Sequence, residues 1–295
     1  ELSDKTIGYG SAAIVVMIWS SWMVVSRIGA LSPLTVYDIT TLRFGIAGTL
    51  SIPVLLIYKP WRTLSWTRIA VLTFLAGIPY QLLIYSGFEF APAVHAGVYM
   101  NAFLPIFTLT IVFVLYRHLP KRIQIIGVVA ILLGAFLNLT DVPATSPDAW
   151  KGDIMFVISA AMYSVFLVLV RKWDVTTPQI LFCVMFMNGL IFVPVWVAVL
   201  PSAMAETSVS QLLLQGIVQG ILATLIGLVL VAFAARKVGA SIIAAFMSGV
   251  PAIAAVLAMI VIDEPIGIIG WVSILILTAG IGLVTVYEPK QQTKD

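Results

Sequence analysis

A long apolar segment with a proline near its middle occurs twice, and this repetition constrains the fold more than any other feature of the chain. The two copies span 93–116 and 239–262. Superposing Pro105 on Pro251 requires a shift of 251 − 105 = 146 residues, and the same shift, without a gap, places Gly134 on Gly280. An apolar segment, a short polar turn and a second apolar segment therefore recur as one block.

Each central proline is expected to interrupt its helix, because proline lacks an amide hydrogen and bends the helix axis. Within a membrane, such a break is tolerated only where protein or a wet cavity satisfies the freed backbone groups. A matched pair of interrupted segments in two halves of a chain is typical of the central site of a transporter. We therefore predict that Pro105 and Pro251 are hinge residues beside a central cavity. The alternative is that each proline only kinks a packed helix.

The composition places the chain in a membrane. Hydrophobic residues make up 61% of its 295 residues and charged residues only 10%, whereas globular domains are about 25% charged. One helical span needs about 20 apolar residues, so the predicted fold class is all-α integral membrane with ten transmembrane helices. The predicted spans are 8–29, 34–57, 67–90, 93–116, 122–139, 151–170, 176–200, 209–235, 238–262 and 266–287.

Lysine and arginine in the short connections predict the orientation, because they concentrate on the cytoplasmic side of membrane proteins. With the N-terminus inside, the outer connections carry only Arg27 and Lys151, and the other basic residues face the cytoplasm. We expect a multi-pass protein of the bacterial inner membrane with both termini cytoplasmic. The first five spans (1–145) and the last five (146–295) would then be inverted repeats. From the start ELSDKTIGYG, which lacks a basic region followed by a cleavage site, we expect no cleavable signal peptide.

A second internal alignment supports the repeat. Trp19 and Arg27 match Tyr163 and Arg171 at a shift of 144, each pair being an aromatic residue followed by an arginine eight residues later.

These motifs resemble the drug/metabolite transporter superfamily, specifically its ten-span type with two EamA repeats. The resemblance covers nearly the whole chain. The residues that carry it are the two aromatic-to-arginine spans, Arg43-Phe44, the two proline spans, Asp263-Glu264-Pro265, Gly127, Gly134 and Gly280. The chain departs from the pattern at His118, which stands where the first half would carry the counterpart of Glu264. The resemblance implies export of metabolites, and the pattern is most similar to bacterial exporters of aromatic amino acids.

Aromatic and polar residues inside the spans are the candidates for a substrate site, since polar groups at membrane depth tend to face a cavity or each other. His95 and Tyr99 lie four residues apart and share a helix face, whereas Asn101 points towards the Pro105 face. The remaining aromatic and neighbouring candidates are Trp19, Trp22, Met23, Tyr80, Gln81, Tyr85, Tyr163 and Phe166. Together they predict an aromatic, charge-poor chamber suited to stacking and cation–π contact. The alternative for each is core packing.

Arg43 is the deepest charge, about nine residues into the second span. We expect Asp38 or Glu89 to neutralise it; the alternative is that it binds a substrate carboxylate. Asn188, Gln219 and Ser248 lie near the middle of the membrane and either bind substrate or hold helices together.

The sequence lacks the motifs that would indicate ATP hydrolysis, metal binding or nucleophilic catalysis. The sequence has no Walker A loop, no metal-ligand spacing, no readable Ser-His-Asp arrangement and a single cysteine, Cys183, so we predict no enzyme activity, no cofactor and no metal. The expected partners are a small-molecule substrate and the lipid bilayer, without nucleic acid, and we favour a monomer. We favour alternating access by passive or weakly coupled exchange. Alternatives are a multidrug or nucleotide-sugar carrier of the same superfamily and, outside transport, a membrane scaffold.

Overall fold

The computed structural model describes residues 4–141 and 147–285, which form ten apolar helical spans. The first half consists of α1 (Asp4–Ala30), α2 (Val36–Tyr58), α3 (Trp66–Leu75) with α4 (Ile78–Phe90), α5 (Ala93–His95) with η2 (Ala96–Asn101) and α6 (Ala102–Tyr116), and α7 (Arg122–Thr140). The second consists of α8 (Ala149–Lys172), α9 (Thr177–Ile180) with η3 (Leu181–Phe186) and α10 (Met187–Val199), α11 (Val209–Gln215) with η5 (Gly216–Ile226) and α12 (Gly227–Val238), α13 (Ala240–Met247) with α14 (Val250–Val261), and α15 (Ile268–Thr285). The predicted all-α fold with ten spans is confirmed. The predicted boundary between the two repeats, at residues 145 and 146, lies outside the described residues.

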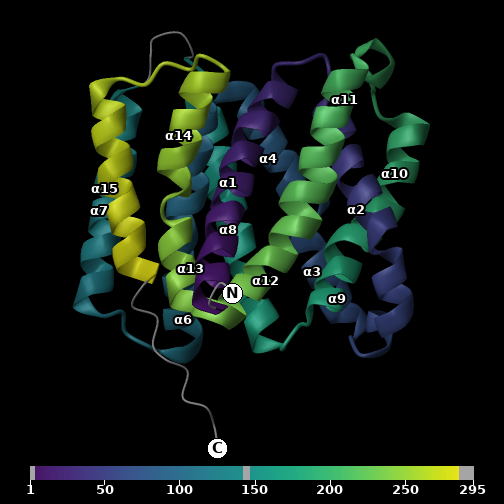
Figure 1. The fold of residues 1–295 in the computed structure, drawn as a ribbon, viewed down its shortest axis with the longest axis horizontal. Coiled ribbons are helices and arrows are strands. Elements are labelled where there is room, and N and C mark those ends of the chain that lie inside the picture. The colour runs from purple at the N-terminus through teal and green to yellow at the C-terminus, as the bar shows by residue number, and fades with distance from the viewer. Residues whose placement is uncertain (1–3, 142–146, 286–295) are drawn as a thin grey trace, which may run out of the picture.

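The spans stand side by side, and their two ends differ in charge (Figure 1). The upper end in this view, here named the acidic end, carries Asp141, Asp148, Asp153, Glu206, Asp263 and Glu264, and its basic residues within 4–141 and 147–285 are Arg27 and Lys151. The opposite, basic end carries the connections with Lys59, Arg117, Lys121, Arg171 and Arg236. Helices α7 and α15 form one edge of the molecule, and α2, α9 and α10 form the other (Figure 1).

The packing of the helices repeats with two-fold symmetry. The third span packs on the sixth through α4 and α8, and its counterpart is the contact of the eighth span with the first through α12 and α1. The sixth span packs on the fourth through α8 and α6, and the first packs on the ninth through α1 and α14. The fifth and tenth spans, α7 and α15, pack on each other. This pairing is the arrangement expected of two inverted repeats.

Both proline spans are irregular at equivalent places. The π-helical segment η2 ends at Asn101, four residues before Pro105, and α13 ends at Met247, four residues before Pro251. The reason is local, because proline cannot donate a hydrogen bond to the carbonyl four residues before it. Proline thus leaves each helix free to widen or break at that point.

Two serines at equivalent positions support these irregular segments. Ser164 Oγ donates to the carbonyl of Leu104, at 3.0 Å, and Ser20 Oγ donates to the carbonyl of Val250, at 3.3 Å. Each acceptor directly precedes the central proline, and the shifts are 164 − 20 = 144 and 250 − 104 = 146. The first and sixth spans therefore bond symmetrically to the two proline spans.

Glycines bring α7 and α15 into close contact. A Cβ atom on Gly127 would lie 2.8 Å from the carbonyl oxygen of Gly280, and a Cβ on Gly280 would lie 2.8 Å from that of Gly127. Ser273 Oγ donates to the carbonyl of Gly134, at 2.6 Å. Small residues allow close backbone approach in membrane helices, so these glycines are explained by packing between the repeats.

Candidate functional site

Aromatic side chains from three spans meet near the middle of the molecule. Tyr80 of α4 stacks on Tyr163 of α8 with ring centroids 5.3 Å apart, and Tyr163 stacks on Phe166 at 5.4 Å. With Trp22 of α1 and Tyr85 of α4 they form what we name the aromatic cluster. The sequence predicted that all five belong to one site.

A buried hydrogen-bond network joins this cluster to the eighth span. Gln219 of η5 accepts from Trp22 Nε1 at 2.6 Å and from the Tyr85 hydroxyl at 2.7 Å through its Oε1 atom. Its Nε2 atom donates to Ser26 Oγ at 3.0 Å and to Gln215 Oε1 at 3.2 Å. Gln219 therefore lies among the predicted site residues, and its amide is fully bonded within the protein.

Arg43 of α2 lies beside the aromatic cluster. Its guanidinium carbon is 5.9 Å from the centroid of the Trp22 ring, and it is close enough to the phenols of Tyr80, Tyr85 and Tyr163 to act on them electrostatically. Its Nε and Nη1 atoms are buried without a hydrogen-bond partner.

The expected neutralisation of Arg43 by a carboxylate is not observed among the described residues. Asp38 instead accepts from the indole of Trp196 at 2.9 Å and from the backbone amides of Thr35 and Ala203. It thereby caps α2 and ties it to the connection after α10. Glu89 is exposed.

Gln81, one turn before Tyr85, is 1% exposed, and neither its Nε2 nor its Oε1 atom has a hydrogen-bond partner. Tyr85 lies beside both the Gln81 amide and the Arg43 guanidinium. A buried amide without partners costs free energy, and Gln81 shares this property with the Nε and Nη1 atoms of Arg43.

His95 and Tyr99 make polar contacts that do not involve the five residues of the aromatic cluster. His95 Nδ1 is 2.7 Å from Asp153 Oδ1, and both side chains are buried. The Tyr99 ring packs edge-on against His95 at 5.7 Å, and its hydroxyl donates to the carbonyl of Ala135. The sequence analysis did not predict Asp153 as the partner of His95. The feature that could have indicated it is the position of Asp153, an acidic residue about one turn inside an apolar span.

The other predicted residues have distinct surroundings. Met23 is 1% exposed in the core, and half-buried Trp19 donates its indole hydrogen to the carbonyl of Ala223 in η5, at 3.2 Å. Asn101 is half-buried at the end of η2. Ser248 lies in the break between α13 and α14 and donates to the carbonyl of Ala245.

Asn188 bonds the backbone at two irregular places. Its Oδ1 atom accepts from the amide of Ile78, and its Nδ2 atom donates to the carbonyls of Thr73, Cys183 and Val184. These groups flank the break between α3 and α4 and the π-helical segment η3. A role for Asn188 in substrate binding remains a prediction; its observed bonds stabilise backbone.

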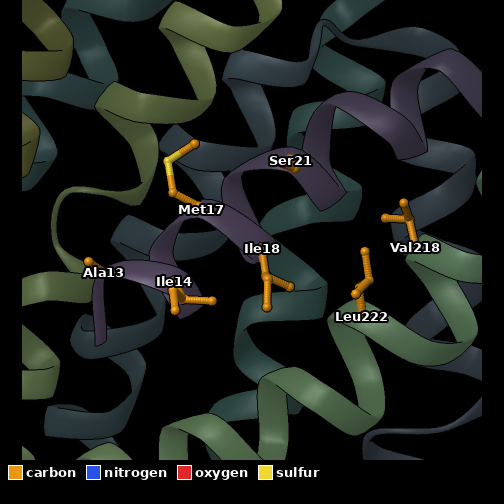
Figure 2. Close-up of a pocket in the computed structure, with 7 residues that line it drawn as sticks. All are labelled: Ala13, Ile14, Met17, Ile18, Ser21, Val218 and Leu222. Carbon is orange, nitrogen blue, oxygen red and sulfur yellow. The ribbon is translucent and has the colours of Figure 1, made fainter. Parts of the chain in front are cut away.

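A groove of about 320 Å³ lies between α1 and η5. Figure 2 shows Ile18 of α1 and Leu222 of η5 directed towards the same space. The lining is completed by Ala13, Ile14, Met17, Ser21 and Val218. Ser21 and Val218 are the chain neighbours of Trp22 and Gln219, so the groove runs beside the network that joins these two side chains.

An ion pair joins two spans at the acidic end. Arg27 Nε, at the end of α1, lies 2.9 Å from Glu264 Oε1, in the turn before α15. Arg27 also donates to the carbonyl of Phe88, and Glu264 Oε2 accepts from the amide of Ala93. Four spans are thereby joined at this end. The pair therefore links the two repeats: Arg27 is the arginine of the first aromatic-to-arginine span, and Glu264 is the acidic residue of the second repeat.

The fourth span is packed differently in its two halves. Every side chain from Ala93 to Met100, near the acidic end, is buried, whereas from Phe103 to Phe113 only Pro105 is buried. The ninth span shows the same trend, with only Ile243 buried between Ile242 and Met247. The proline spans are therefore tightly packed towards the acidic end and loosely packed towards the basic end.

Comparison with known proteins agrees with the architecture. One solved crystal structure matches over 96% of this chain and 96% of its own, with a TM-score of 0.65 and 15% sequence identity, and at this identity the likeness concerns the fold. A search of curated proteins found no match. The model of the EamA-like transporter family, however, matches residues 6–140 and again residues 150–286. Two EamA repeats thus cover nearly the whole sequence, and the chain belongs to the EamA-like transporter family of the drug/metabolite transporter superfamily.

Proposed function

We propose that this transporter exports small amphipathic metabolites, amino acids including aromatic ones, across the bacterial inner membrane by alternating access. The observation that carries the proposal is the aromatic cluster, to which both repeats contribute at the meeting point of the first, third and sixth spans. Aromatic faces favour flat or apolar side chains. The substrate would bind beside these rings, between the proline spans and the first, third, sixth and eighth spans.

The asymmetric packing supports a state open towards the cytoplasm. With the basic end cytoplasmic, the Arg27–Glu264 pair closes the outer side, and the loosely packed halves of the proline spans lie on the inner side. An exporter must load its substrate from inside, and this state suits that step. Rocking of the two repeats about the proline breaks would then expose the site to the outside.

Flux into proteoliposomes tests the proposal. Purified protein should increase the flux of labelled aromatic amino acids in a screen over the twenty amino acids. Tyr80→Ala and Tyr163→Ala, which remove the central stacked pair, should reduce this flux severalfold. Trp66→Ala, at an aromatic residue that is 76% exposed, should leave it unchanged. Flux of cationic dyes but not of amino acids would favour a multidrug carrier instead.

A nucleotide-sugar carrier is less well supported. Its diphosphate would require several cationic partners, whereas Arg43 is the one cation beside the aromatic cluster among the described residues.

A further inference from the structure

We propose that Arg43 and Gln81 together bind a carboxylate, and hence that the transported molecules are monocarboxylates with an aromatic or apolar body. The inference deepens the proposed function and rests on it. It begins from a charge that the described part of the protein leaves without a counter-ion.

Arginine stays protonated in proteins, so Arg43 brings a permanent positive charge among membrane-spanning helices. Such a charge is costly unless it is paired and hydrogen-bonded. Two of its nitrogen atoms are buried without partners, and Asp38 and Glu89, the carboxylates expected to neutralise it, are engaged elsewhere or exposed. The Trp22 ring, 5.9 Å away, stabilises a cation only in part. An anion from outside the chain would complete the pair.

Gln81 supplies the second, independent observation. Its side chain is 99% buried, and both of its polar atoms lack a hydrogen-bond partner. By contrast, Gln219 nearby uses both amide atoms within the protein. Arg43 lies over the Trp22 ring, and Trp22 donates to the same Gln219 oxygen as Tyr85, one turn after Gln81. The unpartnered guanidinium nitrogens and the unpartnered amide therefore flank one hydrogen-bond network. A guanidinium with unpartnered N–H groups and an added amide donor suits the two oxygen atoms of a carboxylate.

The surroundings restrict the ligand further. The other lysines and arginines of the described residues lie in the first or last turn of a span or in a connection. One cation balances one negative charge, which fits a monocarboxylate better than a phosphate ester. The stacked rings of Tyr80 and Tyr163 lie beside this charge and suit an aromatic or apolar body.

Competition in proteoliposomes tests the inference in the unmodified protein. Flux of labelled phenylalanine is measured at neutral pH against three analogues. The first, 3-phenylpropionate, keeps the carboxylate of phenylalanine but not the ammonium. The second, 2-phenylethylamine, keeps the ammonium but not the carboxylate, and the third, phenylalanine amide, replaces the carboxylate with a neutral amide. We expect the first analogue to compete and the other two to compete at least tenfold less well.

Substitution of Arg43 and Gln81 then tests whether these two residues recognise the carboxylate. Arg43→Gln should raise the half-saturating phenylalanine concentration about tenfold or more, as expected for loss of a charged hydrogen bond, and should abolish discrimination between phenylalanine and its amide. Arg43→Lys should retain part of that discrimination, and Gln81→Leu should weaken it. The matched control is Arg68→Gln, since Arg68 also lies over a tryptophan, Trp173 at 5.3 Å, but is exposed at the basic end.

The outcomes separate this inference from the function on which it rests. Phenylalanine flux that 2-phenylethylamine inhibits as strongly as 3-phenylpropionate would overturn the carboxylate site and leave amino-acid export intact. Unchanged discrimination in a folded Arg43→Gln protein would do the same. Absence of amino-acid flux from the unmodified protein would overturn both.

Discussion

At the scale of single residues, the structure separates polar side chains that the fold satisfies from those that it does not. Gln219, Asn188 and Asp38 use their polar atoms within the protein. Arg43 and Gln81 do not. All five looked alike in sequence, as isolated polar residues in apolar spans. The distinction depends on partners from other helices, and the proposed carboxylate site rests on it.

Gln219→Leu should destabilise the protein, because it leaves the buried donors of Trp22 and Tyr85 without an acceptor. We expect the free energy of unfolding to fall by roughly 1–3 kcal/mol, seen as a Tm several degrees lower in detergent. Gln211→Leu is the control, since Gln211 lies on the same span, is half-buried, and has an unpartnered Nε2 atom. Equal Tm values for the Gln219 variant and the unmodified protein would contradict the structural role of this network.

At the scale of helices, the two proline spans are irregular at equivalent places. The fourth and ninth spans break before Pro105 and Pro251, and serines of the sixth and first spans bond the carbonyl just before each proline. Gly97 of η2 packs against Pro251, where an added Cβ would lie 3.0 Å from the proline Cα. The two irregular segments therefore touch each other, in a position to move together.

Pro105→Ala and Pro251→Ala should slow transport without weakening the fold. Each change restores an amide that can bond the carbonyl of Asn101 or Met247, so the helix becomes more regular and bends less easily. We expect turnover to fall on the order of tenfold, which corresponds to about 1.4 kcal/mol in the barrier, with Tm unchanged or higher. Pro194→Ala, in α10 away from the proline spans, is the control. Normal turnover in both variants would argue against their role as hinges.

At the scale of the whole molecule, the two repeats are alike in topology but differ in how their ends close. The acidic end has the Arg27–Glu264 pair. At the basic end, the positions equivalent to Arg27 and Glu264 are Arg171 and His118, so a histidine stands in the sequence where the acidic end has a glutamate; His118 is exposed, and its Nδ1 atom lies 3.1 Å from the carbonyl oxygen of Tyr116. The two repeats thus differ in sequence at the position that supplies the carboxylate of the ion pair at the acidic end.

Glu264→Gln should shift the protein towards a state open at the acidic end, because Arg27 loses its counter-charge. The measurement is the labelling rate of Ala96→Cys in a Cys183→Ser background by a membrane-impermeant maleimide added on the acidic side. Ala96 is fully buried near that end, and we expect labelling to become severalfold faster. Asp148→Asn removes an exposed ion pair with Lys151 at the same end and should change nothing. Equal labelling of the Glu264 variant and its parent would refute the closing role.

The sequence by itself determined the ten spans, the inverted repeat and the position of both helix breaks. Long apolar runs and the missing amide of proline are properties of local sequence, and the 146-residue shift can be read directly. Only the tertiary structure decided which polar groups meet, such as His95 with Asp153 and Arg27 with Glu264. It also revealed the π-helical segments η3 and η5. The physical reason is that lipid and protein interior are both apolar: helices that are hydrophobic on all sides carry no periodic signal of which face turns inward, so their contacts depend on packing.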